Sequence, residues 1–240
     1  MKETDFEIRK EQVYANVPQP FSVLYLSDFH FNSYSRKVAK WMIDRVNELQ
    51  PDLILLGGDY VDTRRGMQEL EFFLEGISMH KNIFAIGGNH DYFFGINKIK
   101  NAFEQKGVEW MEKDTKSIYL KGTQIQIDGN QVSKKLNTSD FTILCVHNPA
   151  VLNADLNPYN LAFAGHLHGS QFVFWENKKG LYPGRLFYKW NVLSRTVNNC
   201  ICLISKGLGD TLPFRYNCKK DMIFVEVLSN FGLWTEDIRP

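Results

Sequence analysis

The sequence predicts an α/β domain in which two β-sheets pack against each other. Three observations support this prediction. The first half of the chain alternates apolar runs of strand length with amphipathic helical segments. The second half contains many short strand candidates with little helix between them. Glycine and proline are spread along the chain and are not gathered into a linker, so we expect a single domain over residues 1–240.

The first half follows a strand–helix–strand pattern that repeats about every 30 residues, the spacing of parallel βαβ units. Continuous apolar runs predict strands, buried on both faces, at Phe21–Leu26, Leu53–Leu56 and Ile83–Ile86. Amphipathic patterns predict helices over residues 36–50, ended by Pro51, over 67–79, and around Ile96, Ile99 and Phe103 up to Gly107.

The second half is expected to form short strands separated by turn residues. These are Ser117–Leu120, Thr123–Ile127, Phe141–Val146, Leu161–Ala164, Phe172–Trp175, Cys200–Ile204 and Met222–Val227. Because little helix intervenes, we expect a second sheet packed on the first, with helices covering the first sheet at least.

Composition excludes several classes of protein. Lysine plus arginine total 28 and aspartate plus glutamate total 27, so the chain lacks the basic surplus of a general nucleic-acid-binding protein. Nucleic acid is therefore not an expected partner. No apolar run approaches the ~20 residues that cross a bilayer, and the charged N-terminus does not resemble a signal peptide. We expect a cytoplasmic protein whose four cysteines are reduced.

Metal-ligand side chains follow the ends of the predicted strands, where ligands of open α/β sheets gather. Five of the six histidines lie in these segments. A lone aspartate after a strand is more often a turn residue or a helix cap, but five such segments together are hard to assemble by chance. The segments are Asp28-Phe29-His30, Gly58-Asp59, Gly88-Asn89-His90-Asp91, His147 and Gly165-His166-Leu167-His168.

This set of donors predicts two cations. A mixture of imidazole and carboxylate suits manganese, iron, zinc or cobalt better than calcium. The candidates outnumber the ligands of one tetrahedral ion. Two ions about 3.5–4 Å apart that share a carboxylate would use all of them. Glycines precede Asp59, Asn89 and His166, and they would allow the backbone to approach an ion closely.

In order and spacing, these segments resemble the calcineurin-like metallophosphoesterase superfamily, over most of the chain. The resemblance implies a four-layer α/β/β/α sandwich. It also implies a centre of two divalent ions, with manganese as the first choice and iron or zinc as alternatives. Segment by segment, it implies that one ion is held by Asp28, His30, Asp59 and His168. The other ion would be held by Asp59, Asn89, His147 and His166, with Asp59 bridging.

The same resemblance implies an enzyme that hydrolyses a phosphodiester or pyrophosphate bond through a hydroxide bridging the two ions. His90 would act as general acid toward the leaving oxygen, and Asp91 would orient its imidazole. A soluble phosphomonoesterase or nucleotide phosphodiesterase is the alternative within the enzyme class. A non-catalytic metal-binding scaffold is the alternative of another class, and the complete set of ligands argues against it.

Further segments resemble a bacterial subgroup that includes membrane-associated UDP-diacylglucosamine pyrophosphatases of lipid A synthesis. They are His147-Asn148-Pro149, residues 165–171, residues 205–209 and residues 213–215. Leu167 and Ser170 depart from the subgroup's usual pattern. The resemblance implies a lipid-linked sugar nucleotide as the candidate substrate. Lys206 and Arg215 are candidates to hold its phosphate, with ordinary surface pairing as the alternative.

Residues 172–190 hold seven aromatic side chains interleaved with Lys178, Lys179, Arg185 and Lys189. The preferred interpretation is a core strand followed by a packed loop. The alternative is an apolar, cationic lip beside the metals, suited to an acylated phosphate substrate or to a membrane surface. Under that alternative, the protein would also make peripheral contact with the inner face of the membrane. The sequence does not predict an oligomeric state.

Overall fold

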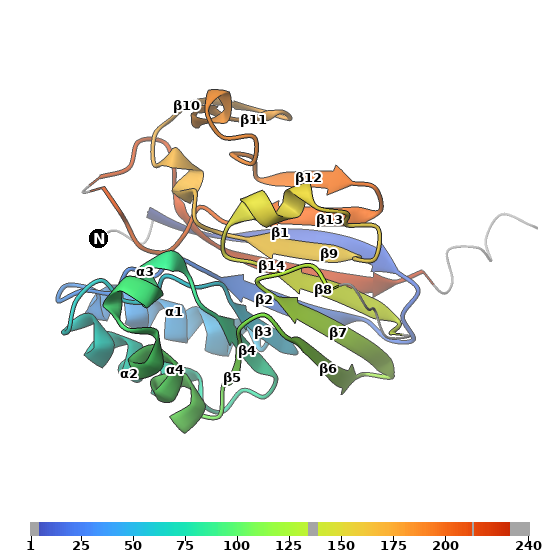
Figure 1. The fold of residues 1–240 in the computed structure, drawn as a ribbon, viewed down its shortest axis with the longest axis horizontal. Helices are drawn as coiled ribbons and strands as arrows, with labels where there is room; N and C mark the ends of the chain where they lie inside the picture. The colour runs from blue at the N-terminus through green and yellow to red at the C-terminus, as the bar shows by residue number, and fades with distance from the viewer. Residues whose placement is uncertain (1–4, 134–138, 213, 231–240) are drawn as a thin grey trace, which may run out of the picture.

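The computed structural model describes residues 5–133, 139–212 and 214–230, which form two six-stranded sheets packed face to face (Figure 1). The first sheet consists, in spatial order, of β1 (Phe6–Ala15), β14 (Lys220–Ser229), β2 (Phe21–Leu26), β3 (Leu53–Leu56), β4 (Ile83–Ile86) and β5 (Glu109–Met111). The second consists of β12 (Ser194–Val197), β13 (Cys200–Ile204), β9 (Leu161–Ala164), β8 (Phe141–Cys145), β7 (Thr123–Gly129) and β6 (Thr115–Leu120). The predicted α/β class is confirmed.

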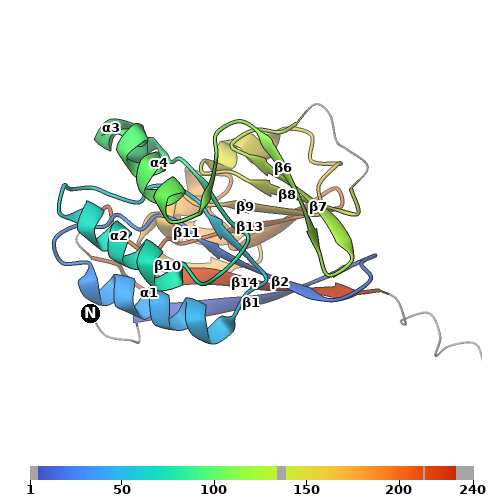
Figure 2. The same ribbon diagram turned by 90° about the horizontal axis from the view of Figure 1, so that it is seen from below.

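Helices cover the outer face of the first sheet, as Figure 2 shows from below. They are α1 (Arg36–Leu49), α2 (Gly66–Ile77), α3 (Asn89–Phe94) and α4 (Ile96–Gln105). Strands β2, β3, β4 and β5 run parallel to one another, because each helix returns the chain to the same end of the sheet. Their carboxyl ends therefore meet at one edge.

The alternation of side chains along each strand divides the core into two layers. In β2, Leu24 and Leu26 pack against the helices, whereas Val23 and Tyr25 pack against the second sheet. The Tyr25 ring stacks on Phe163 of β9 with 4.9 Å between ring centroids. Burial on both faces explains why these strands are apolar throughout.

The outer face of the second sheet has a different cover. Among the described residues it carries no α-helix; the short 3₁₀ helix η2 (Pro149–Asn153) and the loops around it lie there. Leu152, Tyr159 and Trp190 pack on this face of the sheet. The fourth layer is thus thinner than the helical layer that the resemblance implies.

Strand β1 is absent from the sequence-based prediction, and so are the short elements α3 and β5. β1 lies at the edge of the sheet and pairs in parallel with β14, far along the chain. Its charged residues interrupt the apolar pattern that would identify a strand in the sequence. Arg9 donates to a carboxylate oxygen of buried Asp221 at 2.9 Å and to the backbone oxygen of Ile204 at 3.0 Å. Long-range partners therefore stabilise this strand.

The predicted strand Phe172–Trp175 lies outside both sheets. It overlaps β10 (Val173–Asn177), which among the described residues pairs with β11 (Gly180–Pro183) alone, in a hairpin that stands off the sandwich at the top of Figure 1. The interpretation of this segment as a core strand is wrong, because Phe174 and Trp175 are exposed. Within the described part of the chain, no helix is long and apolar enough to span a membrane.

Candidate metal centre

The seven predicted metal ligands come together where strands of both sheets end. Asp28 and His30 follow β2, Asp59 follows β3, Asn89 begins α3 after β4, His147 follows β8, and His166 and His168 follow β9. Five of the side chains that line the resulting pocket of about 370 Å³ are Asp59, Asn89, His90, His166 and His168.

The first group consists of Asp28, His30 and His168, whose candidate ligand atoms lie within 4.8 Å of one another. The two imidazoles face each other, with 3.2 Å between their Nε2 atoms. Asp28 Oδ1 accepts the backbone N–H of His166 at 2.9 Å, whereas the buried Oδ2 has no hydrogen-bond partner among the described residues. A buried carboxylate oxygen without a partner beside two imidazole nitrogens fits a bound cation.

The second group consists of Asp59, His147 and His166, again within 4.8 Å. His147 Nδ1 donates to the backbone oxygen of Gly57 at 2.9 Å, which leaves Nε2 as the acceptor nitrogen. This Nε2 lies 3.2 Å from Asp59 Oδ2, 3.0 Å from Asn89 Oδ1 and 3.2 Å from His166 Nδ1. The ring is thus oriented as a metal-binding histidine normally is.

Asp59 connects the two groups through one oxygen. Its Oδ1 accepts the backbone N–H of His90 at 2.8 Å. Its Oδ2 lies 3.2 Å from His147 Nε2 in the second group and 3.8 Å from His30 Nε2 in the first. A carboxylate shared by two cations needs this placement.

The pKa values of two histidines reflect these contacts. Burial alone would lower the pKa of His147, but the hydrogen bond and charge of Asp59 raise it to about 9. Burial lowers the pKa of His168 to about 4, so this imidazole is neutral near pH 7. A neutral imidazole is the form that binds a metal, so a cation bound in the second group would displace the proton that Asp59 favours on His147 Nε2.

Left-handed backbone positions the candidate ligands. Positive φ angles occur at Asp28 (56°), His30 (45°), Asp59 (57°), His166 (72°) and His168 (52°). A residue other than glycine pays about 1–2 kcal/mol for this conformation. Strain of this kind gathers at functional sites, where it aims side chains that a regular strand would point elsewhere.

Two glycines are required by close approach to the candidate ligands. A Cβ added at Gly88 would lie 2.2 Å from Asp59 Oδ1. A Cβ at Gly165 would lie 2.2 Å from Asp28 Oδ2 and 2.2 Å from Ser27 Oγ. Distances this short leave no room for a side chain, so glycine lets the loops close around the carboxylates.

Asp91, predicted to orient the His90 imidazole, has backbone partners among the described residues. Its carboxylate is buried and accepts backbone N–H groups of Asp59, Tyr60 and Gly88, each at 2.8 Å. Burial raises the pKa of Asp91 to about 6 despite these bonds. Asp91 therefore ties the loop after β3 to the start of α3.

The sequence-based prediction misses Asp62, the residue that orients His90. Asp62 Oδ1 lies 3.1 Å from His90 Nδ1 and 2.9 Å from His30 Nδ1. One carboxylate thus holds both a candidate ligand and the candidate general acid. Carboxylates behind metal-binding histidines commonly fix the ring orientation in this way.

Comparison with known proteins decides the family. A family model of calcineurin-like phosphoesterases matches residues 21–198, more than half of the chain. This chain belongs to the calcineurin-like phosphoesterase family. Membership confirms the superfamily resemblance and the expectation of an enzyme that hydrolyses phosphoesters, and the two groups above are its candidate metal-binding residues.

Relatives of this calcineurin-like phosphoesterase come from several bacteria. It is 25% identical to an uncharacterised metallophosphoesterase of Aquifex aeolicus, covering 85% of this chain and 84% of that protein. It is 29% identical to the uncharacterised metallophosphoesterase YkuE of Bacillus subtilis (84% and 77%). It is 26% identical to the phosphodiesterase YaeI of Escherichia coli (87% and 83%). It spans 49% of a longer Helicobacter pylori metallophosphoesterase.

Solved structures share the fold at low identity. A 5'-nucleotidase precursor of Thermus thermophilus matches with a TM-score of 0.51 and 13% identity, over 87% of this chain and 54% of that chain. The thiohydrolase SoxB of the same organism matches with a TM-score of 0.50 and 9% identity, over 86% and 56%. At these identities the likeness concerns the fold alone.

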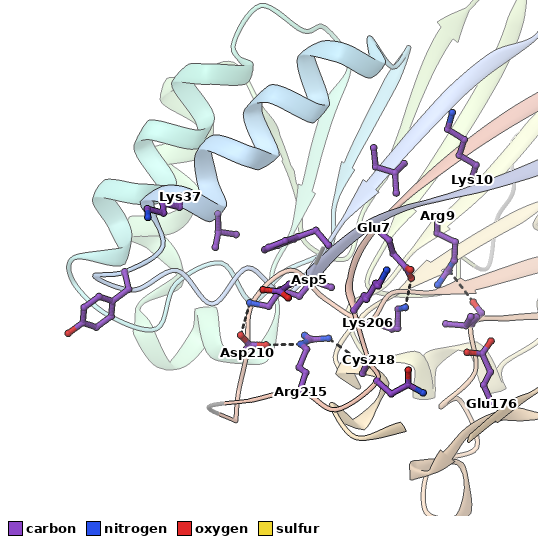
Figure 3. Close-up of a pocket in the computed structure, with 18 residues that line it drawn as sticks. Asp5, Glu7, Arg9, Lys10, Lys37, Glu176, Lys206, Asp210, Arg215 and Cys218 are labelled. Atoms are coloured by element: carbon purple, nitrogen blue, oxygen red, sulfur yellow. Dashed lines mark hydrogen bonds and ion pairs between the residues drawn. The ribbon is translucent and has the colours of Figure 1, made fainter. Parts of the chain in front are cut away.

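Lys206 and Arg215 of this phosphoesterase line a separate, larger cavity of about 1210 Å³ (Figure 3). Both have acidic partners there. Lys206 pairs with Glu7, and Arg215 Nε donates to Asp210 at 2.7 Å. Arg215 also reaches toward the centre, with Nη2 3.3 Å from His168 Nδ1. Both residues thus form the ion pairs that the sequence left open as the alternative to phosphate binding.

Proposed function

We propose that this calcineurin-like phosphoesterase hydrolyses a phosphodiester or pyrophosphate bond with two divalent cations. Asp28, His30, Asp59 and His168 would hold one, and Asp59, Asn89, His147 and His166 would hold the other. The observation that carries the proposal is the position of Asp59 Oδ2, within 3.8 Å of a histidine of each group. Cations bound there would supply Lewis acidity toward phosphoryl oxygens and lower the pKa of water.

His90 is the candidate general acid. It lines the same pocket as Asp59 and His166, and its ring is half-exposed, so it can meet a bound substrate. Asp62 holds Nδ1 and thereby leaves Nε2 to face away from that carboxylate, free to protonate a leaving oxygen. Asp62 is the positioning residue for this step, and Asp91 maintains the loop that presents His90.

We further propose manganese as the resident metal and a lipid-linked sugar nucleotide of the UDP-diacylglucosamine type as the substrate. Imidazole, carboxylate and amide donors suit manganese, with iron and zinc as alternatives. Support for the substrate comes from the resemblance of residues 165–171 to the corresponding subgroup. The apolar side chains of Leu167, Tyr188 and Leu212 at the metal pocket also suit an acylated substrate.

Metal analysis and a substrate panel test the proposal. Elemental analysis of metal-replete protein should give about two ions per chain, and Asp59→Asn should bind fewer. The panel contains a generic diester, a monoester, a cyclic nucleotide and a UDP-linked acyl sugar, each assayed with manganese. Monoester turnover far above diester turnover would favour the phosphomonoesterase instead.

The role of His90 has its own test. His90→Ala should keep its metal content and lose about 10²–10⁴-fold in turnover of a diester with a poor leaving group, the usual contribution of general acid catalysis. A substrate with a good leaving group needs less protonation and should be affected less. Unchanged turnover on the poor leaving group would remove His90 from this role.

A further inference from the structure

Large apolar side chains gather on the surface around the β10–β11 hairpin. Fourteen large apolar residues are exposed among those described, and eight of them lie between residues 174 and 216. These eight, the aromatic lip, are Phe174, Trp175, Leu186, Phe187, Tyr188, Leu212, Phe214 and Tyr216. Phe187 is 78% exposed and Leu186 is 69% exposed. Apolar surface concentrated in this way marks an interaction site.

Hydrogen bonds connect the segments that carry the aromatic lip. Gln171 is buried, and its Oε1 accepts the backbone N–H of Leu212 at 2.8 Å while its Nε2 donates to the backbone oxygen of Phe214 at 3.3 Å. The backbone N–H of Val173 donates to the oxygen of Tyr216 at 2.9 Å. These bonds join the hairpin to residues 211, 212, 214 and 216, and the Phe174 and Tyr216 rings lie together with 5.7 Å between their centroids.

The aromatic lip adjoins the candidate metal centre. Tyr188 and Leu212 belong to the lip and also line the pocket that contains Asp59 and His166. Whatever covers the lip therefore also lies beside the entrance to the pocket. This proximity favours an occupant that carries phosphate groups.

Positive charge accompanies the apolar side chains. Residues 171–190 contain four basic side chains, Lys178, Lys179, Arg185 and Lys189, and one acidic side chain, Glu176. Lys178 and Lys179 are exposed, and neither forms an ion pair within the described part of the chain. Exposed aromatic rings mixed with lysines are typical of surfaces that enter the headgroup region of a bilayer.

We propose that the aromatic lip docks this enzyme on the surface of an anionic lipid bilayer, with the metal pocket beside the lipid headgroups. Leu186 and Phe187 would enter the boundary between headgroups and acyl chains. Lys178, Lys179 and Lys189 would meet the negative surface potential. The docking itself does not rest on the proposed function. The proposed use of docking, which is to bring the metal pocket to a phosphate carried by a lipid, does rest on that function.

Vesicle binding by the full chain tests docking without any activity assay. The protein should co-sediment with phosphatidylglycerol-containing vesicles and much less with pure phosphatidylcholine vesicles. Binding should weaken as salt is added, because lysine contacts with headgroups are screened. Fluorescence of Trp175, which is 51% exposed, should shift to shorter wavelength on binding, and Trp175→Phe should remove that shift.

Matched variants distinguish vesicle binding through the aromatic lip from nonspecific binding through any exposed apolar side chain. The double substitution Leu186→Ser with Phe187→Ser should weaken vesicle binding at least about tenfold, since two apolar side chains leave the bilayer. The control pair Met79→Ser and Tyr119→Ser removes residues that are just as exposed, at 90% and 77%, on other parts of the molecule. This pair should bind as the parent does. Thermal unfolding would confirm that both pairs fold.

Charge reversal gives a second comparison. Lys178→Glu with Lys179→Glu should abolish the preference for anionic vesicles, whereas Lys81→Glu with Lys98→Glu, which reverses exposed lysines elsewhere, should keep it. Equal loss in both pairs would show an effect of net charge and would overturn the proposal. Asp59→Asn should bind vesicles normally, so failed hydrolysis and failed docking are distinguishable.

Two further results would overturn docking. One is the absence of binding to anionic vesicles by the folded parent protein. The other is a dimer in solution that becomes a monomer in the Leu186→Ser and Phe187→Ser variant, which would make the aromatic lip an interface between two copies of the chain.

Discussion

Paired substitutions of Asp62 and Asp91 by asparagine separate catalysis from loop stability. Asp62 Oδ1 lies 2.9 Å from His30 Nδ1 and 3.1 Å from His90 Nδ1. Although burial alone would raise the pKa of Asp62, the hydrogen bond with His30 lowers it, so this carboxylate is charged at neutral pH. Asp62→Asn therefore removes a negative charge that faces two imidazoles. Asp91 contacts only backbone among the bonds that the structure gives its carboxylate.

The expected magnitudes follow from these contacts. Loss of a carboxylate behind a metal-binding histidine typically costs about 10–100-fold in metal affinity or activity, so Asp62→Asn should lower turnover by about that factor. In Asp91→Asn, one carboxylate oxygen becomes an NH₂ group that faces a buried N–H donor. Each orphaned backbone donor costs about 1–3 kcal/mol. For a chain of this size, about 2–4 °C of melting temperature is lost per kcal/mol.

The assays are diester hydrolysis with manganese and thermal unfolding, applied to both variants. Asp62→Asn should lose turnover with a smaller fall in melting temperature than Asp91→Asn shows. Asp91→Asn should lose about 2–12 °C and keep most turnover per folded molecule, measured well below its melting temperature. Full turnover in Asp62→Asn, or lost turnover in Asp91→Asn at an unchanged melting temperature, would refute the assignment of the orienting role to Asp62.

Three other predictions concern single contacts. Gly165→Ala should reduce both metal content and melting temperature, because its Cβ would lie 2.2 Å from Asp28 Oδ2; Gly107→Ala, with nothing within 4 Å, should keep its metal. Tyr60→Phe should cost about 1–2 kcal/mol in denaturant unfolding, since this buried hydroxyl lies 2.8 Å from the backbone oxygens of both Leu56 and Ile86 and its single proton bonds to one of them. Burial would raise the pKa of Asp52, but Lys121 and Ser22 lower it. Asp52→Asn should therefore cost at most about 1 kcal/mol at pH 7, and this difference should vanish as the pH falls through the folded pKa; a constant difference down to pH 2 would exclude this pairing.

The strands that the sequence predicts most closely are those buried on both faces. β2, β3, β4, β9 and β13 have the predicted bounds, because an uninterrupted apolar run identifies such a strand without knowledge of its neighbours. β1 lacks this property. Its Arg9 and Glu11 interrupt the pattern, and the partners that justify a charged strand there lie about two hundred residues away in sequence. Local periodicity carries no information about such partners.

The candidate metal ligands were predictable because each directly follows a buried strand. Asp62 was not, because its position depends on pairing that continues beyond the sheet. The backbone N–H of His30 donates to the oxygen of Asp59 at 3.0 Å, and Phe31 forms an isolated parallel bridge with Val61. The loops after β2 and β3 therefore run side by side as far as Phe31 and Val61. Extending the parallel register of the two strands past their ends would have placed Asp62 opposite Asn32, two residues from His30 and on the same face.

Positive φ at five candidate ligands yields a final prediction, in which glycine and alanine exchange their usual order of stability. His166 has φ 72°, a conformation that costs an ordinary residue about 1–2 kcal/mol and glycine almost nothing. His166→Gly and His166→Ala both delete the same imidazole, so both should lose the same metal contact. In chelated samples, where binding energy does not contribute, the glycine variant should be more stable to urea by about 1 kcal/mol. At a strained position the backbone term outweighs the greater freedom of glycine in the unfolded chain. A more stable alanine variant would mean that this backbone relaxes at no cost, and the view that the fold holds its ligands in strained positions would then be wrong.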